Sequence, residues 1–390
     1  MIPYGKHHID EEDIQAVVNV LKSGVLTQGP AVEAFEQAIA TYVGAKYAIA
    51  VSSGTAALHL AALVAGVGPG KALITSPITF VASANAGLYA GGDVAFADIE
   101  PDTVNMSPLA LSAALEKHPN TKAVIPVHFA GLPCDMPAIK ALADAAGAIV
   151  IEDAAHALGA SYPDGRRVGC CAHSLMTIFS FHPVKAIAAG EGGMITTNDE
   201  SVYRKLLRLR SHGINKLDDP FMDVAQSQTN GHANPWYYEM QELGFHYRIT
   251  DMQCALALSQ FGKLDSFISR RRELVKRYDT AFSTLRHSRP AQASGRDESG
   301  HHLYVLRIDF DAIEKSRDQL MMALRKRDIG TQVHYIPVPA HPHYRTLGHL
   351  PEAFPNAQEY YQEALSIPVF YDLTEQQQNH VIAAIQELVG

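Results

Sequence analysis

The first two-thirds of the chain alternate short, continuous apolar runs with stretches of helical character. Strands are expected at 47–51, 73–75, 94–97, 124–129 and 148–151, and helices at 55–65, 80–89, 109–117 and 139–146. Uninterrupted apolar runs are typical of strands buried on both faces, and their alternation with helices predicts a mainly parallel sheet. Two further runs, 175–181 and 194–197, have no helix-sized insertion between them, which allows a hairpin or an antiparallel edge. We therefore predict an α/β fold with a large mixed sheet.

The character of the sequence changes at about residue 250. A long helical periodicity covers Thr250 to Leu285 and carries Arg and Lys on its polar face. The segments 303–308, 319–326 and 332–336 and a final helix at 374–389 indicate a smaller α+β domain. Because 390 residues exceed the usual size of a single core, two domains are expected, 1–250 and 251–390. Residues 214–242 are largely polar, include Trp236, Tyr237 and Tyr238, and are expected to form a long connecting loop.

Composition excludes several classes of protein. The formal net charge of -9 argues against a nucleic-acid partner, since phosphate binding needs clustered Lys and Arg. The acidic start has no apolar signal region, and no apolar run approaches the roughly 18 residues of a membrane helix, so a cytoplasmic protein without a membrane segment is expected. The 4 cysteines contain no C-x-x-C pair, and neither a metal site nor a disulfide framework is indicated.

Polar residues follow three of the predicted strands, where ligands bind in open α/β sheets. The first group is Ser52-Ser53-Gly54-Thr55-Ala56, directly after the strand at 47–51. A turn of small residues that runs into a helix exposes backbone N–H groups and the positive end of the helix dipole, which suits a phosphate. The alternative is an ordinary N-cap at Ser53 or Thr55.

The second and third groups supply a carboxylate and an amine. Glu152 and Asp153 follow the strand at 148–151, and we interpret Glu152 as a cap for the next element. Asp153 could instead keep the nitrogen of a pyridine cofactor protonated, which makes the ring an electron sink. Lys185 follows the strand at 175–181, beside the glycine-rich path 190–193. Desolvation there would lower its pKa, and the neutral amine attacks aldehydes to form imines.

With these motifs in this order, the chain resembles the sugar aminotransferases of the DegT/DnrJ group. That group belongs to the aspartate-aminotransferase-like fold, fold type I, of pyridoxal-phosphate (PLP) enzymes. The resemblance covers nearly the whole chain and rests on these segments: Leu26–Pro30, Ser52–Ala57, Glu152–His156, Ser180–Lys185, Gly190–Gly193 and Tyr247–Asp251.

The resemblance implies pyridoxal 5'-phosphate as cofactor, with pyridoxamine phosphate (PMP) as intermediate. Lys185 would be the catalytic residue, because it would hold the cofactor as a Schiff base and move the proton. A dehydrating branch of the family has histidine at this position, so lysine favours amino transfer. The other site residues implied are Gly54, Thr55 and Ser180 at the cofactor phosphate, Phe80 stacked on the ring, Asp153 at the ring nitrogen, and His156 and His246 near the cofactor.

Two of these positions depart from the family pattern. Many members have Gln where this chain has His156, and His246 stands where an Asn from the partner subunit often reaches the cofactor phosphate. Thr27 and Arg248 are the candidate substrate-binding residues, and Arg248 would lie close to the anionic donor in the neighbouring site. A homodimer with shared active sites is therefore expected.

A narrower resemblance points to the branch that acts on UDP-linked 4-keto-6-deoxy-N-acetyl sugars in pseudaminic-acid synthesis. It implies transfer of an amino group from L-glutamate to C4 of the sugar. This resemblance rests on the segments Thr27–Gly29, Ser180–Lys185, Pro235–Glu239 and Val333–Pro337.

Three alternatives stay open. The chain could aminate another nucleotide-linked 4-ketosugar. It could be a non-catalytic PLP-binding sensor, against which Lys185 and Asp153 argue. It could also be a nucleotide-sugar dehydrogenase or epimerase, but the G-x-G-x-x-G loop that such an enzyme needs after its first strand is replaced by Ser52-Ser53-Gly54-Thr55. His341-Pro342-His343 is interpreted as a surface loop near the substrate in preference to a metal site.

Overall fold

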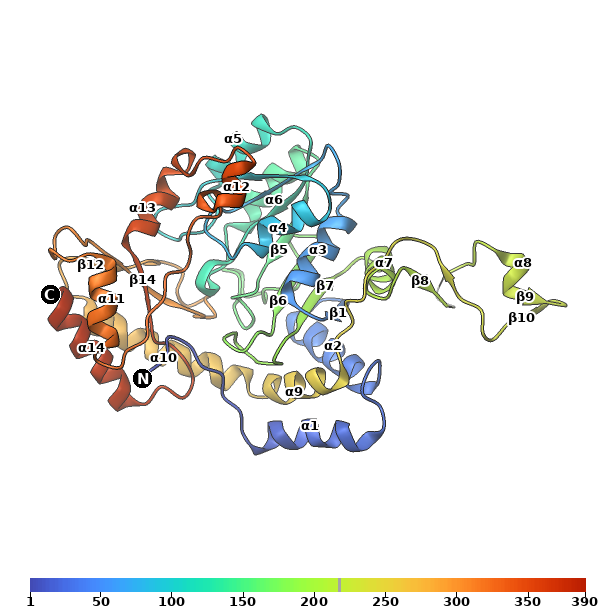
Figure 1. The fold of residues 1–390 in the computed structure, drawn as a ribbon, viewed down its shortest axis with the longest axis horizontal. Coiled ribbons are helices and arrows are strands. Elements are labelled where there is room, and N and C mark those ends of the chain that lie inside the picture. Colours follow the sequence, from blue (N-terminus) through green and yellow to red (C-terminus); the bar gives the residue numbers. More distant parts are fainter. Residues whose placement is uncertain (217–218) are drawn as a thin grey trace.

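A seven-stranded sheet forms the centre of the first part of the protein (Figure 1). The computed structural model describes residues 1–216 and 219–390. The strands follow the order β1-β7-β6-β5-β4-β2-β3, and only β7 runs antiparallel to its neighbours. The sheet is therefore mixed, as the close spacing of the last two strands predicted. Its strands are β1 (Tyr47–Val51), β2 (Ala72–Thr75), β3 (Asp93–Phe96), β4 (Thr121–Ile125), β5 (Ile149–Asp153), β6 (Met176–Ser180) and β7 (Gly193–Thr197).

Both faces of this sheet are covered by helices, because alternate strand residues point to opposite faces. In β1, Ile49 packs with the helices of one face, whereas Ala50 packs with those of the other. The first face carries α3 (Gly54–Val64), α4 (Ala82–Tyr89) and α7 (Glu200–Arg210). The second carries α2 (Pro30–Val43), α5 (Pro108–Lys117), α6 (Met136–Ala145) and α9 (Asp251–Phe261).

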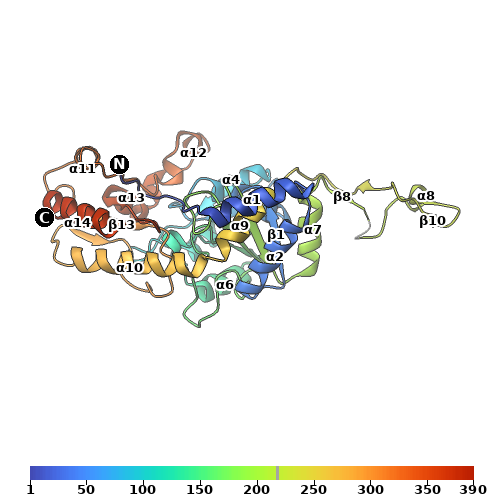
Figure 2. The same ribbon diagram turned by 90° about the horizontal axis from the view of Figure 1, so that it is seen from below.

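A smaller antiparallel sheet organises the C-terminal part, where both chain termini lie (Figures 1 and 2). Its strands are β12 (Ser288–Pro290), β13 (Tyr304–Ile308) and β14 (Ala364–Ile367). Three helices share its core, α10 (Leu264–Phe282), α11 (Arg317–Arg325) and α14 (Glu375–Val389). The remaining helical elements are α1 (Glu11–Ser23), α12 (Pro342–Thr346), α13 (Pro355–Glu363), η1 (Phe129–Gly131), η2 (Val338–Ala340) and η3 (Pro351–Ala353).

The helix expected over Thr250 to Leu285 is interrupted. It divides into α9 and α10 at Gly262 and Lys263, and α9 packs against α1 and α2. The residues 332–336 form no strand, and Gln332 makes a single bridge to Ser366. The division into domains 1–250 and 251–390 stays a prediction.

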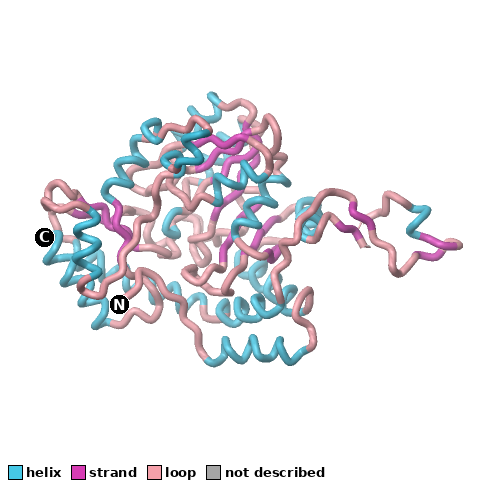
Figure 3. The backbone as a smooth tube through the Cα atoms, in the orientation of Figure 1, coloured by secondary structure: helices cyan, strands magenta, loops and turns pink. Residues whose placement is uncertain are grey.

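Residues 214–216 and 219–242 form an arm that extends away from the body of the molecule (Figures 1, 2 and 3). The arm holds only short elements: β8 (Ile214–Asn215), α8 (Val224–Ser227), β9 (Gln228–Thr229), β10 (His232–Ala233) and β11 (Glu239–Met240). Several of its large apolar side chains are exposed, among them Trp236 at 73% and Met222 at 78%. In the described part of the chain, no helix has the length and apolar character needed to span a membrane.

Candidate active site

A cavity of about 740 Å³ lies at the carboxyl ends of β1, β5 and β6. Both parts of the chain line this cavity. Residues at and after the ends of β1, β2, β4, β5 and β6 form one wall, and His302 and residues 332–336 form another. The structure brings together most of the site residues predicted from the sequence. Those that line the cavity are Gly54, Thr55, Phe80, Asp153, His156, Ser180 and Lys185.

The N-terminus of α3 forms one end of this cavity. Ser53 is the N-cap, and its hydroxyl accepts a hydrogen bond of 3.1 Å from the backbone N–H of Ala56. The backbone N–H groups of Gly54 and Thr55 have no hydrogen-bond partner among the described residues. A Cβ at Gly54 would lie 3.0 Å from the Cβ of Ser180, so a larger residue would require the Ser180 side chain to shift. An N-cap at Ser53 and a phosphate-binding helix end are compatible, because the cap leaves the backbone N–H groups of Gly54 and Thr55 free to donate.

Asp153 projects into the cavity from the end of β5. Its carboxylate is 5% exposed and is fixed by two hydrogen bonds, one from the Ser83 hydroxyl at 2.6 Å and one from the Ala155 N–H at 3.1 Å. The Ser83 hydroxyl in turn lies 2.7 Å from that of Thr79. These contacts hold a carboxylate in a fixed orientation at the cavity wall.

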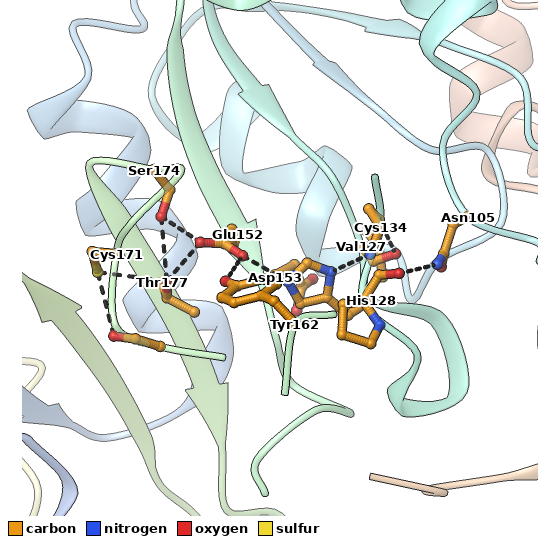
Figure 4. Close-up of polar contacts among 12 residues, drawn as sticks. Asn105, Val127, His128, Cys134, Glu152, Asp153, Tyr162, Cys171, Ser174 and Thr177 are labelled. Atoms are coloured by element: carbon orange, nitrogen blue, oxygen red, sulfur yellow. Dashed lines mark hydrogen bonds and ion pairs between the residues drawn. The ribbon is translucent and has the colours of Figure 1, made fainter. Parts of the chain in front are cut away.

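Glu152 has a different role from the cap that the sequence suggested. It is fully buried on the opposite face of β5, where it is the centre of a polar network (Figure 4). Its carboxylate lies 2.8 Å from Nε2 of His128 and accepts hydrogen bonds from the hydroxyls of Tyr162, Ser174 and Thr177. Burial alone would raise the pKa of Glu152, but these contacts hold that pKa below its ordinary value. Because adjacent strand residues face opposite ways, Glu152 is structural and only Asp153 reaches the cavity.

Lys185 lies in the turn after β6, where its backbone N–H donates a hydrogen bond of 2.8 Å to the carbonyl of His182. The side chain is half-buried and borders the cavity. Desolvation lowers the pKa of the amine from its ordinary value of 10.5 to about 8, although the charge of Asp153 acts in the opposite direction. About a tenth of Lys185 is therefore the neutral, nucleophilic amine at pH 7, far more than of an ordinary lysine.

The sequence did not identify the wall that the C-terminal part contributes. His302, His334 and Tyr335 line the cavity opposite the strand ends. The Tyr335 hydroxyl lies 3.1 Å from Nε2 of His156, and the His302 ring lies 4.3 Å from the His156 ring. Tyr335 belongs to the segment Val333–Pro337, which resembles the sugar-aminotransferase pattern. That resemblance was the one feature of the sequence that could have identified Tyr335 as a site residue.

Thr27, His246 and Arg248 do not line this cavity. Thr27 forms a bridge with Thr250, next to Arg248, and the ring of His246 stacks on His212 at 5.3 Å. In the described ranges, Arg248 makes no ion pair, and Asp251 instead accepts hydrogen bonds from the N–H groups of Gly29 and Ala31.

His341 also lines the cavity, as expected for a loop near the substrate. Within residues 1–216 and 219–390, no group of three or more His, Cys, Asp or Glu side chains is arranged to hold a metal ion.

Comparison with known proteins places this geometry in context. The chain is 41% identical over 394 residues to the spore coat polysaccharide biosynthesis protein SpsC of Bacillus subtilis, with 100% of this chain and 97% of SpsC covered. Its structure matches that of Helicobacter pylori PseC, an aminotransferase involved in the biosynthesis of pseudoaminic acid. The TM-score is 0.89 at 29% identity, and 100% of this chain and 99% of PseC are covered.

Streptococcus pneumoniae Spr1654, solved in a PMP-form, matches equally well. The TM-score is 0.89 at 29% identity, with 100% and 99% of the two chains covered. These neighbours confirm the expected α/β fold of the aspartate-aminotransferase type. The model of the DegT/DnrJ/EryC1/StrS aminotransferase family matches residues 7–386. The chain therefore belongs to the DegT/DnrJ/EryC1/StrS aminotransferase family.

Proposed function

We propose that this protein transfers the amino group of L-glutamate to C4 of a UDP-linked 4-keto-6-deoxy-N-acetylhexosamine, as in pseudaminic-acid synthesis. Family membership makes the protein an aminotransferase, and the PLP-form and PMP-form of Spr1654 support pyridoxal phosphate as cofactor. The observation that carries the proposal is the convergence of the free helix N-terminus, Asp153 and Lys185 in one cavity.

The residues around the cavity fit this cofactor at each of its polar ends. The unpartnered N–H groups of Gly54 and Thr55, with the Ser180 hydroxyl, would hold the phosphate at the positive end of α3. Asp153 would hold the ring nitrogen, and the neutral amine of Lys185 would meet the aldehyde. Phe80, which is 58% exposed, offers a face on which the ring can stack.

When bound, pyridoxal phosphate supplies an electron sink that lets the C–H bond beside the transferred nitrogen ionise. The residues of this chain do the positioning and move the proton. Asp153, oriented by Ser83 and Ala155, keeps its negative charge fixed at one place in the cavity. Lys185 can take up a proton and return it, because its lowered pKa leaves both protonation states populated near neutral pH.

The identity of the sugar substrate is supported by two of the similar proteins. The similarity to PseC and the segments around Trp236 and Tyr335 support a UDP-linked N-acetyl sugar. SpsC, which is named for spore coat polysaccharide biosynthesis, supports a second candidate, another nucleotide-linked 4-ketosugar. The cytoplasmic location expected from the sequence stays a prediction.

A panel of nucleotide 4-ketosugars separates the two candidates. We expect amino transfer to UDP-2-acetamido-2,6-dideoxy-β-L-arabino-hexos-4-ulose to be at least about tenfold more efficient than transfer to dTDP-4-keto-6-deoxyglucose. A site that hydrogen-bonds an N-acetyl group loses about tenfold or more in kcat/KM when the substrate lacks that group. The measurement is kcat/KM for each sugar with L-glutamate as donor. Equal values would remove the narrower assignment and leave the general one.

We also propose a homodimer in which each subunit completes the site of the other. The arm exposes Trp236, Tyr238 and Met240, and such aromatic and apolar side chains are enriched at interfaces. A two-fold axis would use this surface twice. Arg248 and His246 lie at the base of the arm and outside their own cavity, a position from which they could serve the neighbouring one.

Mixing two inactive variants tests this arrangement. Lys185→Ala and Arg248→Ala subunits should each be nearly inactive alone. In a mixed dimer, one site then carries both defects and the other carries neither, so about half of the wild-type activity per mixed dimer should return. The measurement is the rate of amino transfer after co-refolding, with subunit exchange verified by mass spectrometry. Mixed dimers that recover no activity would place Arg248 in the site of its own subunit.

A further inference from the structure

The cavity has few cationic side chains for a site that binds an acidic amino donor. No arginine occurs among the described residues that line it, and Lys185 is its only lysine. Lys185 is already assigned to the cofactor. Besides hydroxyl, amide and backbone N–H groups, the side chains of this subunit that border the cavity and could meet a carboxylate include five imidazoles, those of His156, His182, His302, His334 and His341.

Among the deeply placed imidazoles of the described residues, His156 and His302 each have an Nδ1 without a partner, but only His302 makes no hydrogen bond through either ring nitrogen. Nε2 of His156 contacts the Tyr335 hydroxyl at 3.1 Å, and Nδ1 of His334 contacts the Ser366 hydroxyl at 2.8 Å. The ring of His302, by contrast, makes no hydrogen bond to any residue in the described ranges, and its Nδ1 is buried without a partner. His302 is 6% exposed and borders the cavity, so a ring nitrogen without an internal partner is available to a ligand that enters there.

The backbone around His302 is held rigidly. Its N–H donates a hydrogen bond of 2.8 Å to the carbonyl of Ala130, and its own carbonyl accepts one of 3.2 Å from Nη1 of the buried Arg271. The ring packs against His156 at 4.3 Å. A side chain fixed in this way, with no internal partner, is preorganised to bind a ligand.

We propose that His302 binds a carboxylate group of the amino donor, and this proposal rests on the proposed function. The donor amine must reach Lys185, and Lys185, His156, His302 and His334 all border the same cavity. His302 would then contribute to the preference for an acidic donor.

The His302 ring binds the carboxylate of the amino donor in its neutral form, through a ring N–H that donates a hydrogen bond. Burial lowers the pKa of His302 well below its ordinary value, and the neighbouring His156, Lys185, Arg271 and His334 act in the same direction. The N–H of a neutral imidazole can donate to a carboxylate oxygen without adding a buried charge beside Lys185.

The test uses the holoenzyme and glutarate, a dicarboxylate that has no amine to transfer. His302→Phe keeps an aromatic ring against His156 but removes the donor, and it should weaken glutarate binding by about tenfold to a hundredfold in calorimetry. His302→Gln restores an N–H and should recover part of the affinity. His301→Gln is the matched control, because His301 is 7% exposed but does not line the cavity, and it should bind glutarate as the wild type does. The KM for the sugar should stay unchanged in all three variants.

A second measurement does not depend on the variants folding. In the wild-type holoenzyme labelled with ¹⁵N-histidine, the His302 ring resonances should shift when glutarate is added. Unchanged resonances, or a His302→Phe holoenzyme that binds glutarate with wild-type affinity, would overturn the assignment. Loss of glutarate affinity in Arg248→Ala but not in His302→Phe would transfer the role to Arg248. A wild-type holoenzyme that accepts no amine from glutamate would overturn the proposed function itself.

Discussion

Lys185→Ala is expected to lower the rate of amino transfer by about a thousandfold or more, because one change removes both the nucleophile and the proton carrier. The variant should fold normally, since the substitution removes an amine that is costly to desolvate. Borohydride reduction of the wild-type holoenzyme should attach the cofactor to a peptide that contains Lys185. The same treatment should leave the variant unlabelled, which mass spectrometry of the digested protein measures.

Lys185→Arg provides the control for charge. It keeps a cation at the same place but offers no nucleophilic amine, because an arginine stays protonated. It should be as inactive as Lys185→Ala, with a melting temperature close to that of the wild type. Near-normal turnover by either variant would contradict the assignment of Lys185.

Asp153→Asn should reduce kcat by about a hundredfold or more. Asparagine has nearly the same shape and can still accept the hydrogen bond from the Ser83 hydroxyl, so the substitution removes mainly the negative charge. Without that charge, the ring nitrogen of the cofactor loses the partner that keeps it protonated. The measurement is the single-turnover rate with L-glutamate at saturating cofactor.

Ser83→Ala separates charge from orientation. It leaves the carboxylate of Asp153 in place but removes the hydrogen bond of 2.6 Å that fixes it. We expect a loss of about tenfold, much smaller than that of Asp153→Asn. If Asp153→Asn with bound cofactor turns over at close to the wild-type rate, the carboxylate is only structural.

The sequence predicted the sheet well, because the positions of its strands depend on local patterns. Continuous apolar runs located β1, β5 and β6, and the short spacing before β7 allowed the antiparallel direction that β7 has, although β7 lies inside the sheet and not at its edge. Gly54, Asp153 and Lys185 were predicted to share a site because they follow strands whose carboxyl ends meet at one edge. The alternation of side chains along β5 also held the information that Glu152 and Asp153 face opposite ways.

What the sequence could not predict depends on contacts between distant segments. His302 and Tyr335 meet His156 only because the C-terminal part folds back over the strand ends. No local periodicity encodes such a contact. The break between α9 and α10 was missed because apolar residues continue at helical spacing on both sides of Gly262, so the glycine alone was a weak signal.

Transfer of nitrogen from donor to sugar is the most direct test of the central claim. The wild-type holoenzyme would be incubated with L-[¹⁵N]glutamate and the UDP-linked 4-keto-6-deoxy-N-acetylhexosamine, and the nucleotide sugar analysed by mass spectrometry. We expect a product in which ¹⁵N replaces the C4 ketone oxygen. It should form in equal amount with 2-oxoglutarate and be absent with Lys185→Ala. A holoenzyme that releases no 2-oxoglutarate and leaves every ketosugar of the panel unlabelled would contradict the central claim.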